Sequence, residues 1–319
     1  MTIVKENREM RAPKIGRNLI VGFIIALVCL TGCTRKLETR FDNGQLKEKY
    51  AVSKDAEGNY IKHGEYVSWY ENGKKKQEGT FKNGKADGKH TFWYDSGKKE
   101  SEGEFIDDKK VGHWITWYEN EQKKVEGEFK DGKKDGKHVF WSDSGKKETE
   151  GEFIDDKKAG HWVTWYENGQ KKSEGEFKDS KKIGKWISWH DNGQKDYEEE
   201  FKEGIRDGKS VRWFANGQKR YEGDFKAGKR IGPWICWYEN GVKNFESEFQ
   251  YGKENGKWVY WYENGQKSSE GGYKDGKKEG RYISWHSNGK KKSEGEYKDG
   301  KKIGEWLYWD EKGEIKSGS

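Results

Sequence analysis

A glycine recurs every 24 residues through most of the chain, and this period constrains the fold more than any other feature. With this glycine as position zero, the fifth residue is always Trp. The eleventh is Lys, the fourteenth is Glu and the seventeenth is Phe or Tyr in every complete repeat. A fixed period of this length is typical of arrays in which each repeat completes its core against its neighbours. The repeat glycines are Gly64, Gly88, Gly112, Gly136, Gly160, Gly184, Gly208, Gly232, Gly256, Gly280 and Gly304.

Each repeat contains two stretches in which apolar and polar residues alternate. The repeat that begins at Gly184 reads GKWISWHDNGQKDYEEEFKEGIRD, and its two stretches are separated by Asn192-Gly193. Asn-Gly tolerates positive φ at both residues, which a type I′ hairpin turn requires. Many repeats carry a second Asp-Gly or Asn-Gly pair, such as Asp131-Gly132, after the second stretch. We therefore predict one β-hairpin per repeat, with a type I′ turn at the first Asn-Gly.

The predicted fold class is all-β: an elongated, single-layer antiparallel meander of repeated hairpins, similar to a solenoid. Strand alternation places positions two and four on one face and positions three and five on the other. If the first turn is a two-residue loop, position two lies opposite position fifteen, which is usually Gly, and position three lies opposite the constant Glu. A Trp at position two can then cover bare glycine backbone.

The composition fits such an array better than a conventional core. Hydrophobic residues make up 30% of the chain and charged residues 38%, which alone would favour disorder. However, the chain holds 17 Trp and 17 Tyr, and disordered chains are poor in aromatic residues. The rings therefore replace an aliphatic core.

The fifth-position tryptophans have two interpretations. Either they belong to the core, or one face of the sheet stays partly open and their rings stack on sugars, bases or protein side chains. On the second interpretation the candidate binding residues are Trp69, Trp93, Trp117, Trp141, Trp165, Trp189, Trp213, Trp237, Trp261, Trp285 and Trp309.

The N-terminus carries the features of an export signal. A basic stretch from Lys5 to Arg17 precedes a twelve-residue apolar run, Leu19 to Leu30, which is short for a membrane span. Leu30-Thr31-Gly32-Cys33 resembles the lipobox of bacterial lipoprotein precursors. This resemblance implies a signal peptide at 1–32, a lipid anchor on Cys33 and a place at the bacterial cell envelope, periplasmic or on the surface. A plain signal peptide or an uncleaved anchor is the alternative, and Met10 is an alternative start.

Residues 33–62 would then form an anchor, a linker and a degenerate first hairpin, and 63–319 eleven repeats, the last one partial. Removal of 1–32 leaves 59 Lys and Arg against 55 Asp and Glu, so the formal net charge falls from +7 to +4. Dense charge of both signs with little net field argues against a nucleic-acid partner.

No sequence pattern indicates catalysis. The seven His fit no zinc-protease motif, and no P-loop or nucleophile elbow occurs. Like-placed histidines such as His90 and His138 lie two repeats apart, too far to share a metal. Cys236 has no disulfide partner. A feature that occurs about ten times indicates packing or multivalent binding, so we expect no enzyme activity, cofactor or metal.

The repeats resemble a known family. EGEFKDGKKDGK, from Glu126 to Lys137, is similar to the MORN repeat. The longer stretch WYENGQKKSEGEFKDSKKIGKW, from Trp165 to Trp186, resembles the MORN-repeat variant, which is common in exported bacterial proteins and often labelled an antitoxin. The resemblance implies a β-hairpin array used for binding or scaffolding. We expect a membrane-anchored, non-catalytic scaffold for a protein partner. The alternatives are a glycan or cell-wall binding module, a lipid-headgroup binding module, and a neutraliser of a partner toxin.

Overall fold

The fold is all-β, as the repeat predicts. The structure is a computed structural model that describes residues 35–316, and every regular element within that range is a β-strand. The chain divides into two compact segments, 1–145 and 146–319. The expected signal peptide at 1–32 and the anchor residue Cys33 lie outside the described residues. Between residues 35 and 316, no helix has the length and apolar character needed to cross a membrane.

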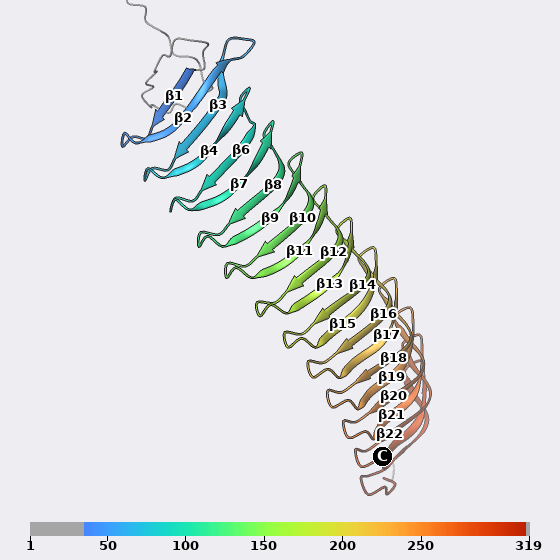
Figure 1. Cartoon of the computed structure of the whole chain (residues 1–319). Coiled ribbons are helices and arrows are strands. Elements are labelled where there is room, and N and C mark those ends of the chain that lie inside the picture. Colours follow the sequence, from blue (N-terminus) through green and yellow to red (C-terminus); the bar gives the residue numbers. More distant parts are fainter. Residues whose placement is uncertain (1–34, 317–319) are drawn as a thin grey trace, which may run out of the picture. The chain divides into compact units, whose positions relative to one another are not determined.

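In the first segment the strands pair antiparallel in chain order, with β4 pairing with β6 past the short β5 (Figure 1). A short strand, β5, also pairs with β4. The strands are β1 Arg35–Arg40, β2 Leu46–Lys54, β3 Tyr60–Trp69, β4 Lys75–Lys82, β5 Lys85–Ala86, β6 Gly88–Trp93, β7 Lys99–Ile106, β8 Lys109–Trp117, β9 Lys123–Lys130 and β10 Lys133–Trp141.

The second segment has the same organisation, an open antiparallel meander from β11 to β24. Its strands are β11 Lys147–Ile154, β12 Lys157–Trp165, β13 Lys171–Lys178, β14 Lys181–Trp189, β15 Lys195–Lys202, β16 Ile205–Trp213, β17 Lys219–Lys226, β18 Lys229–Trp237, β19 Lys243–Gln250, β20 Lys253–Trp261, β21 Lys267–Lys274, β22 Lys277–Trp285, β23 Lys291–Lys298 and β24 Lys301–Tyr308.

The two turns of a repeat differ from the prediction. At the first turn only Gly73 has positive φ, at +83°, while Asn72 does not. The Gly73 amide donates to the Tyr70 carbonyl and the Tyr70 amide to the Lys74 carbonyl. This is a type I turn followed by a left-handed glycine, a three-residue loop with a bulge, so the predicted type I′ turn is wrong here. The Asn72 side chain accepts from the Lys74 amide at 3.0 Å, and this bond favours the type I form.

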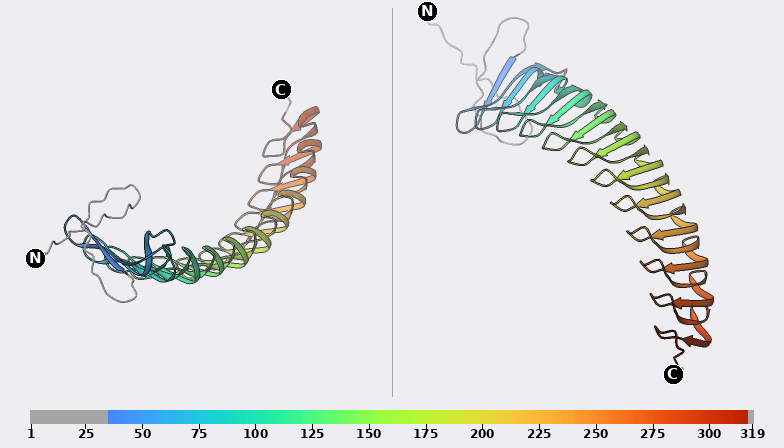
Figure 2. Two further views of the ribbon diagram at one scale, coloured as in Figure 1. Left: turned by 90° about the horizontal axis from the view of Figure 1, so that it is seen from above. Right: turned by 60° about the horizontal axis from the view of Figure 1, so that its bottom comes forward.

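The type I′ geometry occurs at the second turn instead. Asn83 and Gly84 both have positive φ, at +51° and +84°, and Asp131 and Gly132 match them. These two-residue loops connect one repeat to the next. The type I′ form is favoured there because its twist matches that of the two antiparallel strands it joins. Within each segment the two kinds of turn lie at opposite ends of the strands, along the two long sides of the sheet (Figure 2).

The predicted register is confirmed despite the different loop. Trp114 pairs with Gly127, and Ile115 pairs with Glu126, which are the expected partners of positions two and three. The bulge absorbs the third loop residue, because the pairing shifts by one between Thr116 and Trp117.

Rings at positions two and seventeen form the core of each segment. Trp114 and Trp162 are each 2% exposed, and Trp234 is 1% exposed. Their centroids lie 4.9–5.0 Å from the Phe at position seventeen of the preceding repeat, with nearly perpendicular planes. The second-position tryptophans are therefore core residues. One sheet face, which we call the aromatic face, carries positions two, four and seventeen.

Candidate functional site

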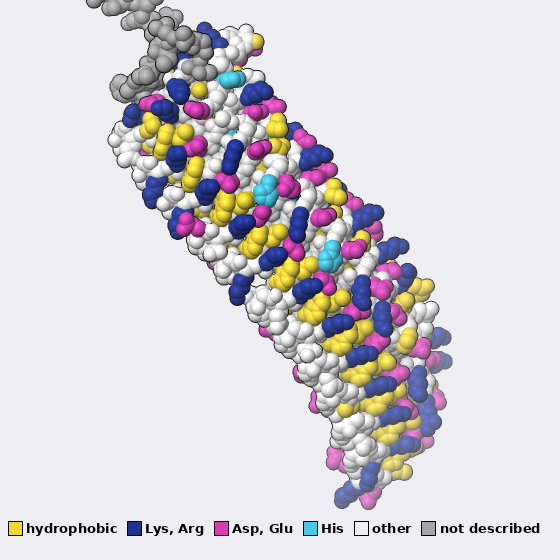
Figure 3. All heavy atoms as spheres, viewed as in Figure 1, with side chains coloured by type: hydrophobic (Ala, Val, Ile, Leu, Met, Phe, Trp, Pro, Cys, Tyr) yellow, Lys and Arg dark blue, Asp and Glu magenta, His cyan; other side chains and the backbone are white. Residues whose placement is uncertain are grey.

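The fifth-position tryptophans lie on the face opposite the aromatic face and are half-buried from Trp69 to Trp309. The ammonium of the eleventh-position Lys of one repeat lies over the indole of the next repeat. Lys147 is 5.1 Å from the ring centre of Trp165, and Lys171 is 5.9 Å from that of Trp189. We call this row of alternating Lys and Trp the Lys–Trp ladder. Figure 3 shows hydrophobic and basic side chains alternating on the face in view.

Every lysine of the Lys–Trp ladder has a carboxylate partner. It bonds the Glu three residues later, at 2.6–3.1 Å in the nine pairs from Lys99–Glu102 to Lys291–Glu294, and Lys75 bonds Glu78. These pairs are largely exposed, so each contributes only about 0–1 kcal/mol. Their main effect is to neutralise the ladder.

A second cation from position one reaches the same Glu in several repeats. Lys185 lies 2.6 Å from Glu198, and Lys209 lies 3.0 Å from Glu222. Glu222 is bonded by both Lys219 and Lys209, and these bonds hold the pKa of its carboxyl below its usual range. The surface is therefore a regular pattern of fixed, compensated charges around half-exposed rings.

This face is hollowed at the start of the array. An open depression of about 660 Å³ lies beside Trp93, and its other walls include Glu78, Lys89 and Lys99. It offers charged groups of both signs beside two aromatic residues, Trp93 and Tyr66, which suits binding of polar chains more than enclosure of a small substrate.

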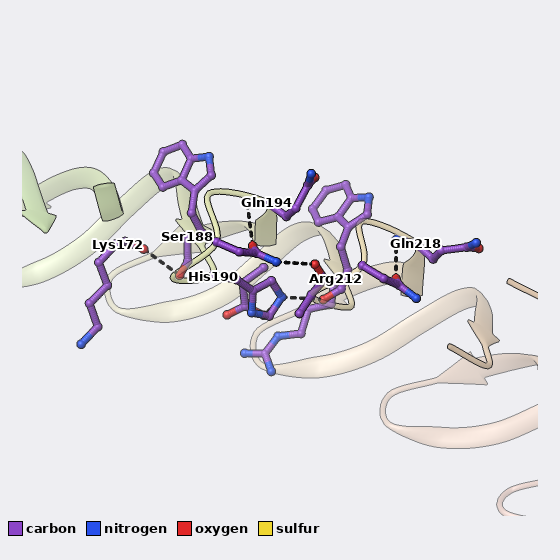
Figure 4. Close-up of polar contacts among 12 residues, drawn as sticks. Lys172, Ser188, His190, Gln194, Arg212 and Gln218 are labelled. Atoms are coloured by element: carbon purple, nitrogen blue, oxygen red, sulfur yellow. Dashed lines mark hydrogen bonds and ion pairs between the residues drawn. The ribbon is translucent and has the colours of Figure 1, made fainter. Parts of the chain in front are cut away.

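The first turns hold successive repeats together. The Tyr70 hydroxyl donates to the Trp93 carbonyl at 2.7 Å, and the Asn72 amide donates to the Asp95 carbonyl at 2.8 Å. Figure 4 shows the equivalent arrangement at His190, whose ring nitrogen lies 3.2 Å from the Trp213 carbonyl. These bonds fix the backbone that carries each fifth-position Trp.

The sequence analysis missed a second row of cations, on the aromatic face. A Lys or Arg two residues before the repeat glycine lies over the core rings in most repeats. Lys110 is 4.1 Å from the ring centre of Trp114, and Lys182 is 4.1 Å from that of Trp186. A recurrent Lys or Arg at this position was the available sign. We call the row the cation column: Lys62, Lys110, Lys134, Lys158, Lys182, Arg206, Arg230, Lys278 and Lys302.

One repeat breaks the ring core with a polar cluster. Glu199 replaces the usual position-fifteen Gly, and its side chain is only 2% exposed. Arg206 donates to it at 3.0 Å, and the hydroxyls of Ser210 and Tyr221 lie at 3.2 Å. Ser210 occupies the place of a core Trp. The two replacements compensate in volume, and the carboxylate is paired as a buried charge must be.

The remaining reactive groups are isolated. Between residues 35 and 316, no three His, Cys, Asp or Glu are placed to hold a metal ion. His90 and His138 are fully buried core residues at position two. Cys236 is a free thiol in the same range, and burial raises its pKa to about 11.

Comparison with known families gives one clear match. The model described as "MORN repeat variant" matches eight stretches of 22 residues, together more than half of the chain. They are 62–83, 86–107, 110–131, 158–179, 182–203, 206–227, 254–275 and 278–299.

Other comparisons add little. No curated protein matches the chain. Among solved structures, the chain is similar to those of TcdB2-TccC3 and TcdB2-TccC3-TEV, each at 8% identity and a TM-score of 0.19. These matches cover 87% and 88% of this chain but only 17% and 18% of those chains.

Proposed function

The chain belongs to the MORN repeat variant family, and on this premise we propose that it is a lipid-anchored, non-catalytic scaffold that binds a protein partner at the bacterial cell envelope. The Lys–Trp ladder carries the proposal. It presents the same half-exposed indole and compensated Lys–Glu pair in repeat after repeat, on a backbone fixed by turn-to-turn hydrogen bonds. A reaction centre needs groups in unlike environments, whereas these repeats supply like ones.

The ladder suits a protein surface in its chemistry. Half-buried Trp supplies apolar contact area at low entropic cost. The surrounding charges of both signs fix the position of a complementary partner along the ladder more than they add overall attraction. Repetition lets weak contacts act together.

Membrane attachment rests on Leu30 to Cys33 and is tested separately. The Cys33→Ser variant should lose incorporation of a radiolabelled fatty acid and leave the membrane fraction. If it is labelled and sediments as the unchanged chain does, the anchor assignment is wrong.

Partner binding is tested by crosslinking and affinity capture from membranes. A ladder variant changes Trp189, Trp213 and Trp237 each to Leu. It should capture at least about tenfold less partner than the unchanged chain, because interface anchors of this type contribute about 2 kcal/mol or more. The matched control changes the exposed Gln170, Gln194 and Gln218 to Ala and should retain it. Near-UV circular dichroism checks that both variants keep packed rings.

Two outcomes contradict this proposal. Equal capture by the ladder variant and the control would remove the ladder from the interface. A captured partner that stops growth whenever the scaffold is absent would instead support the toxin-neutralising alternative.

A further inference from the structure

Two rows of cations over aromatic rings lie on opposite faces, and they differ in charge compensation. In the Lys–Trp ladder, every lysine from Lys75 to Lys291 has its own Glu. In the cation column, Lys62 lies near Glu48 and Arg206 bonds Glu199. Within the described residues, five other members form no ion pair: Lys110, Lys182, Arg230, Lys278 and Lys302.

The column is held in place by the rings beneath it. In the second segment, Arg230 lies 4.6 Å from the ring centre of Trp234 and 5.3 Å from that of Phe249. Lys278 lies 4.7 Å from the ring centre of Tyr282 and 5.0 Å from that of Tyr297. Cation–π attraction of about 0.5–2 kcal/mol fixes each head group without neutralising it. Each cation can therefore still accept an anion.

More lysines flank the second turns, but strand alternation directs their side chains to the face opposite the column. In the repeat of Lys182, Lys178 precedes the turn and Lys181 follows it. The repeats of Arg230, Lys278 and Lys302 have the same three-cation arrangement. Two residues interrupt the column, Ala86 in the first segment and Glu254 in the second, and burial raises the pKa of the Glu254 carboxyl. Some of the turn lysines are also paired, Lys181 with Glu203 at 3.2 Å and Lys226 with Asp207 at 2.9 Å, so the column cations carry the uncompensated charge.

The step length defines the ligand. One hairpin comprises two strand spacings, so column cations of adjacent repeats are about 9.6 Å apart, and Arg230 and Lys278 are two such steps apart. One such step is close to one disaccharide of an extended β-linked glycan. The cation column is complementary to a polymer that repeats its anion at the same interval, since each repeat that it spans adds an equivalent contact.

We propose that the cation column of the second segment binds an acidic polysaccharide that carries one carboxylate per disaccharide. The column cations receive the carboxylates, and the half-buried rings beside them, such as Tyr282 and Tyr297, contact the sugar rings. The site lies on the face opposite the Lys–Trp ladder, so it is independent of the proposed protein partner.

The test uses the full chain and hyaluronan, a glycan with one carboxylate per disaccharide, in isothermal titration calorimetry at low ionic strength. A column variant changes Lys182, Arg230, Lys278 and Lys302 to Gln. The matched control changes Lys171, Lys219, Lys267 and Lys291 to Gln, which removes the same charge from the opposite face. The column variant should bind at least about tenfold more weakly, and the control should change less than about twofold because its lysines are already paired.

A footprint keeps the proposal testable if the column variant does not fold. Acetylation of the unchanged chain, read by mass spectrometry, should be slowed by hyaluronan at Lys182 and Lys278 but not at Lys171 and Lys267. Equal protection on both faces, or none, would overturn the proposal.

Further polymers test the spacing and the class of ligand. Amylose, which is neutral, should not bind. Binding as tight to polyglutamate, to duplex DNA or to vesicles of anionic phospholipid would show a general attraction to anions and would overturn the glycan assignment. Polygalacturonate, with a carboxylate on every sugar, should bind no more tightly per chain length than hyaluronan if the interval matters; much tighter binding would show that charge density alone decides.

Discussion

The indole of Trp114 lies over the backbone of Gly103, and a Cβ added to Gly103 would stand 2.2 Å from its ring. Gly103 belongs to the preceding repeat and is not the register partner of Trp114, which is Gly127. The pairing of β7 with β8 is irregular between Glu102 and Glu104, opposite Gly112, and this bulge directs the ring across the strand. The same relationship joins Trp162 to Gly151 and Trp234 to Gly223.

This contact predicts a large effect of one methyl group. Gly103→Ala should lower the free energy of unfolding by about 1–3 kcal/mol, because the buried ring must move. Gly271→Ala is the matched control, since its Cβ would meet the nearest ring at 3.1 Å and the next repeat carries Tyr282 in place of Trp. Thermal melts compare the two. Equal shifts in Tm would show that the Trp114 indole moves away from the added methyl group at little cost in stability.

The polar cluster predicts a strong coupling between two positions. Glu199→Gly alone leaves a gap and an unpaired Arg206, and Ser210→Trp alone forces an indole against a buried carboxylate. Both single variants should be destabilised. The double variant recreates the Gly–Trp contact of the other repeats and should recover at least about 2 kcal/mol relative to the sum of the single variants. Additive effects in a double-mutant cycle of denaturant melts would contradict this.

The exposed first turn of one repeat predicts a gain in stability. Glu121 has a φ of +70° where every other repeat has Gly. A left-handed conformation costs a residue with a side chain about 1–2 kcal/mol, and the ion pair of Glu121 with Lys98 is exposed and weak. Glu121→Gly should therefore raise the free energy of unfolding by about 1 kcal/mol. The neighbouring Glu119→Gly lacks this strain and should be neutral or destabilising; a reversed order would refute the argument.

The half-buried thiol of Cys236 predicts slow reaction with thiol reagents. Burial raises the pKa of Cys236 to about 11, so near pH 8 only about a thousandth of it is thiolate. Reaction with a disulfide reagent such as dithionitrobenzoate should be far slower than that of glutathione and should accelerate on unfolding in guanidinium. A folded chain that reacts as fast as glutathione would show that position four is open to solvent.

The column predicts a pH dependence for hyaluronan binding. Burial lowers the pKa of Lys182, which faces Glu199, Arg206 and Lys158, and that of Lys278, which faces Lys302 and Glu254. Only the protonated ammonium attracts a carboxylate. The affinity for hyaluronan should therefore be at its full value at neutral pH. It should decline as pH rises, beginning below the pH at which an ordinary lysine deprotonates. Calorimetry at constant ionic strength checks this, and an affinity that rises toward alkaline pH would contradict it.

Much of the fold follows from local residue chemistry. The 24-residue period with alternation of period two predicts hairpins and the pairing of Trp114 with Gly127, because a one-residue slip would exchange the two faces. The turn types do not follow from Asn-Gly alone. Asn72 has a side-chain bond to the Lys74 amide that selects a type I turn, and that bond depends on the length of the loop.

The functional surfaces depend on contacts between repeats, which a single repeat does not reveal. The sequence places Trp165 on the face of Lys147, but only the stacking of repeats brings that ammonium over the indole. In the same way Lys182 is an ordinary residue beside a turn until Trp186 folds back beneath it.

The first-turn bonds give the array a direction. Tyr70 and Asn72 donate to carbonyls of the following repeat, at Trp93 and Asp95, and the ring of Trp114 closes over the glycine before it. A hairpin is thus finished only by its successor. Order should therefore spread along the array one repeat at a time, because each hairpin is complete only when the next one has paired with it.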